Sequence, residues 1–203
     1  MKTLYDRTYY ENGIPAGVSC YTNFRWLPEL TIPMAARMVE YLHIGRRDTI
    51  LDFGCAKGYL VKALRLLGRE AWGCDISEYA LSQAPIDTAH YLMSDIPVGR
   101  TYDWIIAKDV FEHIPEEALL NVLSALRVIG QNIFVIVPLG SDGHYFVPSY
   151  DLDKTHCVRR DLSWWHKRLE KVGWFVRRST YRVEGIKDNY ADYPQGNGFL
   201  VAS

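Results

Sequence analysis

The chain has 203 residues, and 23 lysines and arginines stand against 24 aspartates and glutamates, for a formal net charge of -1. A chain of this length suits one domain and buries enough surface to hold a core without disulfides or a structural metal. Because the charge is balanced, neither a nucleic acid nor an anionic membrane is expected as the main partner.

Four cysteines are scattered along the chain without a C-x-x-C pair: Cys20, Cys55, Cys74 and Cys157. Scattered thiols in a chain with an adequate core are typical of a reducing compartment. No apolar run is long enough for a membrane span, and the first residues lack the apolar block of a secretory signal. We therefore expect a soluble, cytoplasmic protein, and the sequence does not indicate its oligomeric state.

Residues 1–32 are aromatic and rich in turn formers, too apolar for a disordered tail. We expect this segment to be an extension or lid that folds over something, followed by one domain at 33–203. Pro33 is expected to open the first helix of that domain, because Met34, Met38 and Leu42 recur at helical spacing.

Apolar runs that predict strands then alternate with amphipathic stretches that predict helices. Strands are expected at 49–53, 71–75, 89–93, 102–108 and 132–138, and helices at 59–67, after Ser77 and after Pro115. This alternation predicts right-handed β-α-β crossovers and a parallel sheet with helices on both faces.

The pattern changes after Pro138. A loop rich in aromatic residues is expected to about residue 160, then a helix over 162–172 and strands at 174–183 and 198–203. Two strands in succession without a helix between them predict an antiparallel pair at the end of the sheet. The fold class expected is therefore α/β, Rossmann-like and doubly wound, with a mostly parallel sheet.

The densest signal is the segment ILDFGCAKGYL at 50–60. A buried strand carries Asp52 near its end, and Gly54, Ala56 and Gly58 follow at every second position before a helix begins. Small residues there let the backbone lie against a ligand, and the helix N-terminus supplies free N–H groups. Asp75 ends the next strand, where a carboxylate can accept both hydroxyls of a ribose. These features predict a nucleoside-containing ligand.

The spacing separates two cofactors. Dinucleotide sites use G-x-G-x-x-G, whereas here the loop is G-x-A-x-G with an acid two residues before it. A carboxylate so near the loop repels a pyrophosphate but can accept from the ammonium of an amino acid. This favours S-adenosylmethionine over NAD.

Four segments in order resemble the motifs of class I S-adenosylmethionine-dependent methyltransferases: LDFGCAKGYL, GCDIS, SDIP at 94–97 and YDWIIAKDVFEHIP. The EHI tail of the last is frequent in the branch that contains quinone-biosynthesis and sugar or antibiotic methyltransferases. The resemblance covers roughly residues 33–203, and the antiparallel final strands match that family's seven-stranded sheet. Ala56 departs from the family's middle glycine, which is tolerated if φ is negative but can weaken cofactor binding.

The resemblance implies a set of cofactor contacts. Asp52 and the backbone around Gly54 would hold the methionine part, and Asp75 would take the ribose hydroxyls. The adenine would meet Ile76, Asp95 and the Ile96 N–H. The remaining residues expected at the cofactor are Ala56 and Gly58 of the loop, Lys108 and Asp109 at the end of the fourth strand, and Tyr10 of the N-terminal segment, which can reach the sulfonium by a cation–π contact. Taken singly, a glycine-rich turn is a weak signal and Asp95 is equally a turn residue before Pro97.

Three histidines are expected near the methyl acceptor, where a base helps an oxygen acceptor lose its proton. His156 is the first choice, because DLDKTHCVRRDLSWW resembles a D-x-x-H loop common in this branch. An equally weighted interpretation is that His156 anchors its loop to Asp153. His113, after the fourth strand, is the second candidate and is more often structural. His144 lies among aromatic residues and is the third.

Metal ligation is not expected, because Asp109, Asp151 and Asp153 show no recognisable Mg²⁺-ligand spacing. The function predicted is methyl transfer from S-adenosylmethionine to a small-molecule acceptor, with a hydroxyl preferred. The alternatives are a non-catalytic S-adenosylmethionine-binding module, a protein or nucleic-acid methyltransferase and an NAD-dependent oxidoreductase. A nucleic-acid base is disfavoured because KDVFEH replaces the [DN]-P-P-[YF] motif of adenine N6 enzymes.

Overall fold

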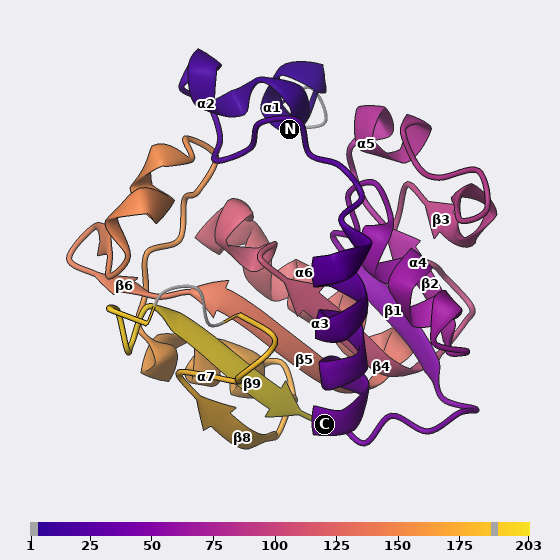
Figure 1. Ribbon diagram of the computed structural model, residues 1–203. Helices are drawn as coiled ribbons and strands as arrows, with labels where there is room; N and C mark the ends of the chain where they lie inside the picture. Colours follow the sequence, from indigo (N-terminus) through magenta and orange to yellow (C-terminus); the bar gives the residue numbers. More distant parts are fainter. Residues whose placement is uncertain (1–3, 188–190) are drawn as a thin grey trace.

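The fold is a seven-stranded sheet with helices on both faces, described here from a computed structural model for residues 4–187 and 191–203 (Figure 1). The sheet strands are β1 (Thr49–Phe53), β2 (Glu70–Cys74), β3 (Leu92–Met93), β4 (Tyr102–Lys108), β5 (Gly130–Pro138), β8 (Val176–Thr180) and β9 (Asn197–Ala202). Their order is β3-β2-β1-β4-β5-β9-β8. The first five are parallel, and β9 runs antiparallel to both β5 and β8. The predicted fold class and the antiparallel final pair are confirmed.

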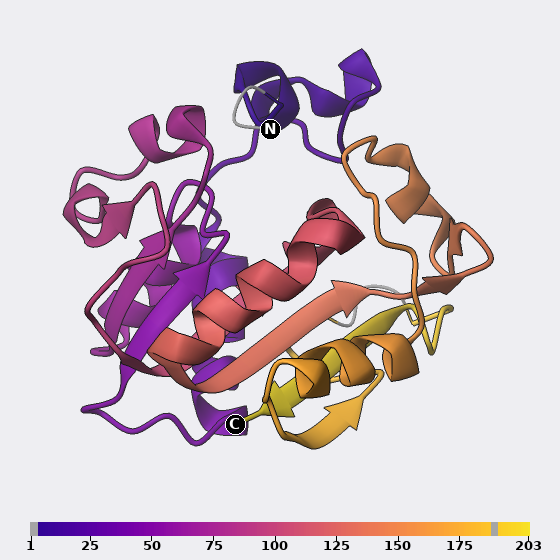
Figure 2. The same ribbon diagram turned by 180° about the vertical axis from the view of Figure 1, so that it is seen from behind.

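The helices are α1 (Arg7–Glu11), α2 (Gly13–Ala16), α3 (Pro28–Tyr41), α4 (Tyr59–Leu66), α5 (Glu78–Ser82), α6 (Glu116–Ile129) and α7 (Leu162–Lys171). Short 3-10 turns lie at η1 (Ala89–Tyr91), η2 (Phe111–His113) and η3 (Pro148–Leu152), and a small hairpin joins β6 (Gly140–Ser141) to β7 (His144–Tyr145). Helices α6 and α7 cover one face of the sheet (Figure 2), and α3 and α4 pack on the other.

Alternation along the central strands divides the core into two layers. Ile105 and Ile106 are adjacent in β4 and both fully buried, yet Ile105 packs with the α6–α7 side and Ile106 with the α3–α4 side. Successive side chains of a strand point to opposite faces, so a strand covered on both sides must be apolar throughout. This explains the unbroken apolar run of β5.

The expected start of the first domain helix is wrong by five residues. Helix α3 begins at Pro28, and Pro33 lies inside it. Pro28 occupies the first turn, where the missing N–H has no intrahelical partner in any case. Pro33 costs one backbone bond in the second turn, and packing of Ala35 and Met38 against the sheet holds the helix in place. The proposed boundary between 32 and 33 therefore falls within one helix.

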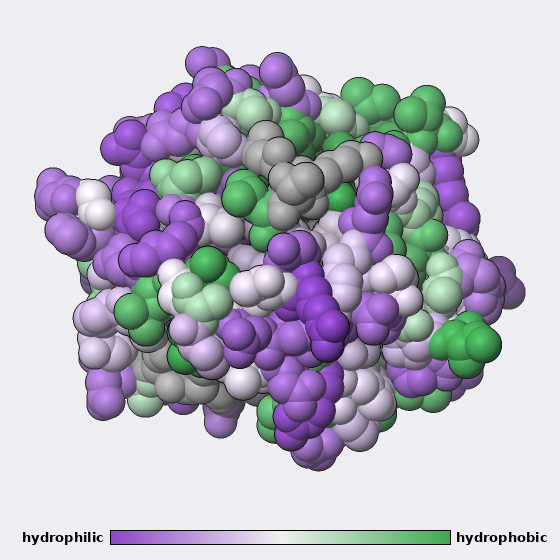
Figure 3. All heavy atoms as spheres, turned by 90° about the horizontal axis from the view of Figure 1, so that it is seen from above, coloured by the Kyte–Doolittle hydropathy of each residue, from purple (hydrophilic) through white to green (hydrophobic). Residues whose placement is uncertain are grey.

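The N-terminal segment lies above the carboxyl ends of the parallel strands, between α5 and the η3 loop (Figure 1). The hydroxyl of Tyr9 donates to Asp153 Oδ2 at 3.0 Å in a buried contact. On the opposite side, the buried ammonium of Lys57 bonds Glu11 and the Phe24 carbonyl, at 2.7 Å for the latter. Viewed from above (Figure 3), this side of the molecule mixes hydrophilic and hydrophobic residues. The contacts Tyr9–Asp153 and Glu11–Lys57 hold the N-terminal segment against two separate loops of the domain.

Candidate active site

A cavity of about 840 Å³ lies between the N-terminal segment and the carboxyl ends of the strands. Its floor includes the loop after β1, the ends of β2 and β4 and the turn after β3, and its roof includes Tyr9, Tyr10, Tyr21 and Phe24. Ligands of open α/β sheets bind where the strand order reverses, which here is between β1 and β4. A cavity of this size accommodates a cofactor-sized ligand.

The glycine loop leaves no room for a side chain at Gly54 or at Gly58. Gly54 has a φ of +78°, and a Cβ there would lie 2.5 Å from Cγ2 of Val110. Gly58 has a φ of +76° and caps α4, and a Cβ there would lie 2.6 Å from Cδ1 of Leu92. The N–H groups of Gly54 and Cys55 both donate to the Cys74 carbonyl, which ties the loop to the end of β2.

Ala56 adopts a φ of +48°, so the condition for tolerating its side chain, a negative φ, is not met. Left-handed backbone brings Cβ close to the following carbonyl. We expect Ala56→Gly to raise the free energy of unfolding by about 1 kcal/mol, measured by urea denaturation. The matched control is Ala36→Gly on the exposed side of α3, which should lower it by about 1 kcal/mol. A loss of stability in Ala56→Gly would contradict the strain argument.

Asp75 organises the ends of β1 and β2. Its Oδ2 accepts from the Ala56 N–H at 2.7 Å and its Oδ1 from the Ser77 N–H at 2.8 Å. Burial raises the pKa of Asp75, while both backbone bonds lower it. Each carboxylate oxygen keeps a second lone-pair site, and Asp75 lines the cavity.

Asp52 is 4% exposed and also lines the cavity. Burial, followed by the neighbouring Asp75 carboxylate, raises its pKa to about 7, and Lys108 opposes the shift. Among residues 4–187 and 191–203, none forms a salt bridge with Asp52, so this buried carboxyl is available to a cationic ligand. The adenine end expected at Ile76, Asp95 and Ile96 also borders the cavity, and Asp95 is exposed with its Oδ2 accepting from Ser94 Oγ.

Asp109 follows β4 in the left-handed conformation, with a φ of +54°. Its carboxylate is held between the ammonium groups of Lys108 and Lys187. Burial raises the pKa of Asp109, but the two ammonium groups outweigh it and hold the pKa well below the usual range. Asp109 is thus an ionised wall of the cavity. No motif or spacing singles out Lys187, which lies 78 positions after Asp109.

Two of the three candidate histidines lie together in the structure, and the third, His144, lies apart from them. His113 lines the cavity, and its ring lies 4.6 Å from that of His156, centroid to centroid. The His156 side chain is 8% exposed, whereas the His144 side chain is 84% exposed and lies 3.7 Å from Asp151. The structure thus brings two of the three candidates together at one end of the cavity.

Glu112 lies beside these two histidines. It was not among the site residues predicted from the sequence. It is 1% exposed, and its Oε1 lies 4.0 Å from Nε2 of His156. Burial and then the Asp109 charge raise the pKa of Glu112 well above its usual value. Burial, with the neighbouring ring, lowers the pKa of His113 to about 4, and burial also lowers the pKa of His156. The signal that could have found Glu112 in the sequence was its place beside His113, within the segment YDWIIAKDVFEHIP.

His156 and the two arginines that follow it in the same loop have partners within the chain. His156 Nδ1 lies 2.9 Å from the Tyr150 carbonyl, so that carbonyl holds the ring, while the backbone N–H of His156 donates to the Asp153 carbonyl at 3.3 Å. Arg159 bonds Asp151 at 2.8 Å and Arg160 bonds Glu116 at 2.7 Å, so carboxylates of the chain already hold both guanidinium groups.

The sequence matches the family described as a methyltransferase domain over residues 25–187. No curated protein matches it in sequence. Similar solved structures include a chain in the complex between the Haloferax volcanii Trm112 methyltransferase activator and a methyltransferase, with 15% identity, 86% of this chain and 90% of that one covered and a TM-score of 0.67. An S-adenosylmethionine-dependent methyltransferase from Archaeoglobus fulgidus has 16% identity, 86% and 96% coverage and a TM-score of 0.66.

A third similar structure is the magnesium protoporphyrin IX methyltransferase of Synechocystis with bound S-adenosylhomocysteine, at 17% identity, with 98% and 90% of the two chains covered and a TM-score of 0.63.

In the described part of the chain, no helix is long and apolar enough to cross a membrane. The carboxyl groups of Asp52 and Asp75, both lining the cavity, fit a cofactor with an ammonium group and a ribose. The chain belongs to the methyltransferase domain family and is a class I methyltransferase that uses S-adenosylmethionine as its cofactor.

Proposed function

We propose that the chain transfers the methyl group of S-adenosylmethionine to a hydroxyl of a small molecule. The observation that supports it best is the cavity itself: it is roofed by the N-terminal segment and has His113 on its wall. A roof pinned at both Asp153 and Lys57 leaves little room for a polymer, which favours a small acceptor.

The cofactor is expected to lie along the floor of the cavity. Its ribose would sit at Asp75, its adenine at Ile76, Asp95 and Ile96, and its methionine part at Asp52 and the Gly54 loop. The remaining space, beneath the aromatic roof and beside Asp109, would take the acceptor. Tyr10, which is 5% exposed and borders the cavity, lies in that roof.

The cofactor supplies a methyl group already activated on a sulfonium, so the protein chiefly aligns the acceptor and excludes water. The acceptor forms a C–O bond as the S–C bond breaks, and the electron pair stays on sulfur. The hydroxyl proton must also leave, and we place the group that promotes its departure at the His113 end of the cavity.

The test is formation of S-adenosylhomocysteine with a panel of hydroxyl, amine and carbon acceptors. We expect hydroxyl compounds to react, and His113→Ala to lower kcat by about tenfold or more, with His156 remaining beside it. His144→Ala is the comparison, because that ring is exposed and we expect it to lower kcat far less. Turnover confined to amines would overturn the hydroxyl proposal. Cofactor binding without turnover on any acceptor would support a non-catalytic binding module instead.

A further inference from the structure

Three potential metal ligands converge at the His113 end of the cavity. Glu112 and His113 come from η2, and His156 comes from the loop after η3. One ligand atom from each lies within 4.8 Å of the other two. The segments are fastened together, because the Glu112 carbonyl accepts from the N–H groups of Cys157 and Val158 at 2.8 and 3.2 Å.

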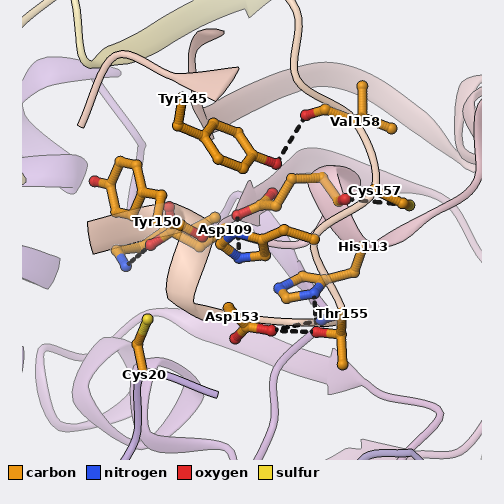
Figure 4. A network of polar contacts seen from close by, with 12 residues as sticks. Cys20, Asp109, His113, Tyr145, Tyr150, Asp153, Thr155, Cys157 and Val158 are labelled. Atoms are coloured by element: carbon orange, nitrogen blue, oxygen red, sulfur yellow. Dashed lines mark hydrogen bonds and ion pairs between the residues drawn. The ribbon is translucent and has the colours of Figure 1, made fainter. Parts of the chain in front are cut away.

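Hydrogen bonds fix which nitrogen of each ring is free. The hydroxyl of Thr155 donates to Asp153 Oδ1 at 2.6 Å, so at 2.8 Å from His113 Nδ1 it can only accept (Figure 4). His113 therefore carries its proton on Nδ1. Nδ1 of His156 faces the Tyr150 carbonyl, which can only accept, so its proton is on Nδ1 as well. Both Nε2 atoms keep a lone pair.

This arrangement is the usual second layer of a metal site, in which a ligating histidine donates its other N–H to a carbonyl or side-chain oxygen. It holds each ring in one orientation and one tautomer. Two histidines that only packed against each other would not need a hydrogen-bond acceptor at each Nδ1.

Glu112 supplies the third ligand. Its Oε2 is buried and has no hydrogen-bond partner among the residues that the structure describes, and its Oε1 is beyond hydrogen-bond distance of His156. A buried carboxyl oxygen without a partner is costly and calls for an explanation. A cation between Glu112 and the two Nε2 atoms would supply it.

The surrounding charge permits a cation. The ammonium groups of Lys108 and Lys187 lie near, but Asp109 pairs with both. Around the two histidines, the carboxyl groups of Asp109, Glu112 and Asp153 lie opposite these two ammonium groups, and a cation bound by Glu112 would hold its carboxyl in the ionised form.

We propose that Glu112, His113 and His156 bind a divalent first-row transition-metal ion, such as Zn²⁺, Fe²⁺ or Mn²⁺. Two imidazole nitrogens and one carboxylate suit these ions better than Mg²⁺ or Ca²⁺, which prefer oxygen ligands. Ligand bonds of about 2.0–2.2 Å require the three groups to draw slightly closer than they lie now. Because His113 borders the cavity, an open coordination position would face the acceptor, and an acceptor hydroxyl bound there would lose its proton more readily. That use of the metal rests on the proposed function, whereas the binding does not.

The test uses the full chain, stripped of metal with a chelator and titrated with Zn²⁺ by calorimetry and with Co²⁺ by visible absorption. We expect one ion per chain and d–d bands of a nitrogen- and oxygen-ligated Co²⁺. Glu112→Gln and His156→Ala should weaken Zn²⁺ binding by about tenfold or more, and Thr155→Val, which keeps all three ligands, should also weaken it. His90→Ala, an exposed histidine on η1, is the matched control and should bind as wild type does.

Titration of each sample with S-adenosylmethionine reports separately on the fold and on the cofactor site. A variant that binds cofactor normally and loses Zn²⁺ supports the metal site, even if no acceptor is ever methylated. Wild-type protein that binds neither Zn²⁺ nor Co²⁺ stoichiometrically would overturn it, whether or not the variants fold. Unchanged Zn²⁺ affinity in Glu112→Gln and His156→Ala would overturn it equally.

Discussion

Asp75→Ala is expected to weaken S-adenosylmethionine binding by about 100-fold, because two charge-assisted hydrogen bonds to the ribose would be lost. The same carboxylate fixes the loop, since it accepts from the N–H groups of Ala56 and Ser77. Its removal leaves both donors without this partner, which adds loop disorder to the loss of direct contacts. Calorimetric titration with S-adenosylmethionine and S-adenosylhomocysteine measures the effect.

Two further variants separate these contributions. Asp75→Asn keeps the shape and one acceptor oxygen but loses the charge, so an intermediate affinity is expected. Asp192→Ala removes an exposed carboxylate elsewhere and should leave the affinity unchanged. Circular dichroism and thermal unfolding check that the fold persists. Wild-type affinity in Asp75→Ala would exclude the placement of the ribose at this residue.

The affinity for S-adenosylmethionine is expected to fall as the pH is lowered from 7.5 to 5.5, by up to about tenfold per unit below the pKa of Asp52. Burial, and then Asp75, raise that pKa to about 7 in the cofactor-free protein. An ammonium group placed against Asp52 favours the ionised form, so binding below pH 7 must first release a proton. Calorimetry in buffers of different ionisation enthalpy measures both the affinity and the proton release.

The matched variant is Asp52→Asn, which has no proton to lose. We expect it to bind about 100-fold more weakly at pH 7.5, since a buried contact to a cation is lost, and to show a much flatter pH dependence. Any slope that remains reports Asp75, whose pKa is also raised. A wild-type affinity that is constant across this range would show that the ammonium does not meet Asp52.

The raised pKa of Asp52 also affects the free energy of unfolding of the cofactor-free protein. Between the usual carboxyl pKa of about 4 and a pKa of about 7, the folded chain binds more protons at Asp52 than the unfolded chain does. The contribution of Asp52 to the free energy of unfolding is therefore fully present below pH 4 and is lost as the pH rises toward 7. If the cofactor ammonium binds at Asp52 as proposed, cofactor binding is expected to offset this loss by pairing the charge.

The strand and helix pattern was predictable because it depends on local periodicity. The apolar run in β5, the Ser77 cap of α5 and the amphipathic pattern of α6 are local signals that can be recognised in the sequence. Short or ambiguous elements were less well predicted. β3 has two residues where five were expected, and α3 begins before Pro33, because tertiary packing and not propensity set those limits.

The cofactor end was also accessible from sequence, for a geometric reason. Asp52, Gly54 and Asp75 each occupy the carboxyl end of a strand or the turn after it, and parallel strands bring those ends to one edge. The positive φ of Ala56 was not accessible, since an alanine signals no left-handed conformation.

Which residues meet at the proposed acceptor end of the cavity depends on the tertiary fold. Nothing in the order of residues shows that His156 meets Glu112 and His113 across more than forty positions, that His144 turns to solvent, or that Lys187 returns to pair with Asp109. The sequence by itself determined the sheet and the cofactor and selected the edge at which we propose that the cofactor binds, because those follow from local pattern and a repeated topology. Only the tertiary structure decided which polar side chains share the far end of the cavity, because loops of unrelated sequence position are joined there by contacts that no local pattern encodes.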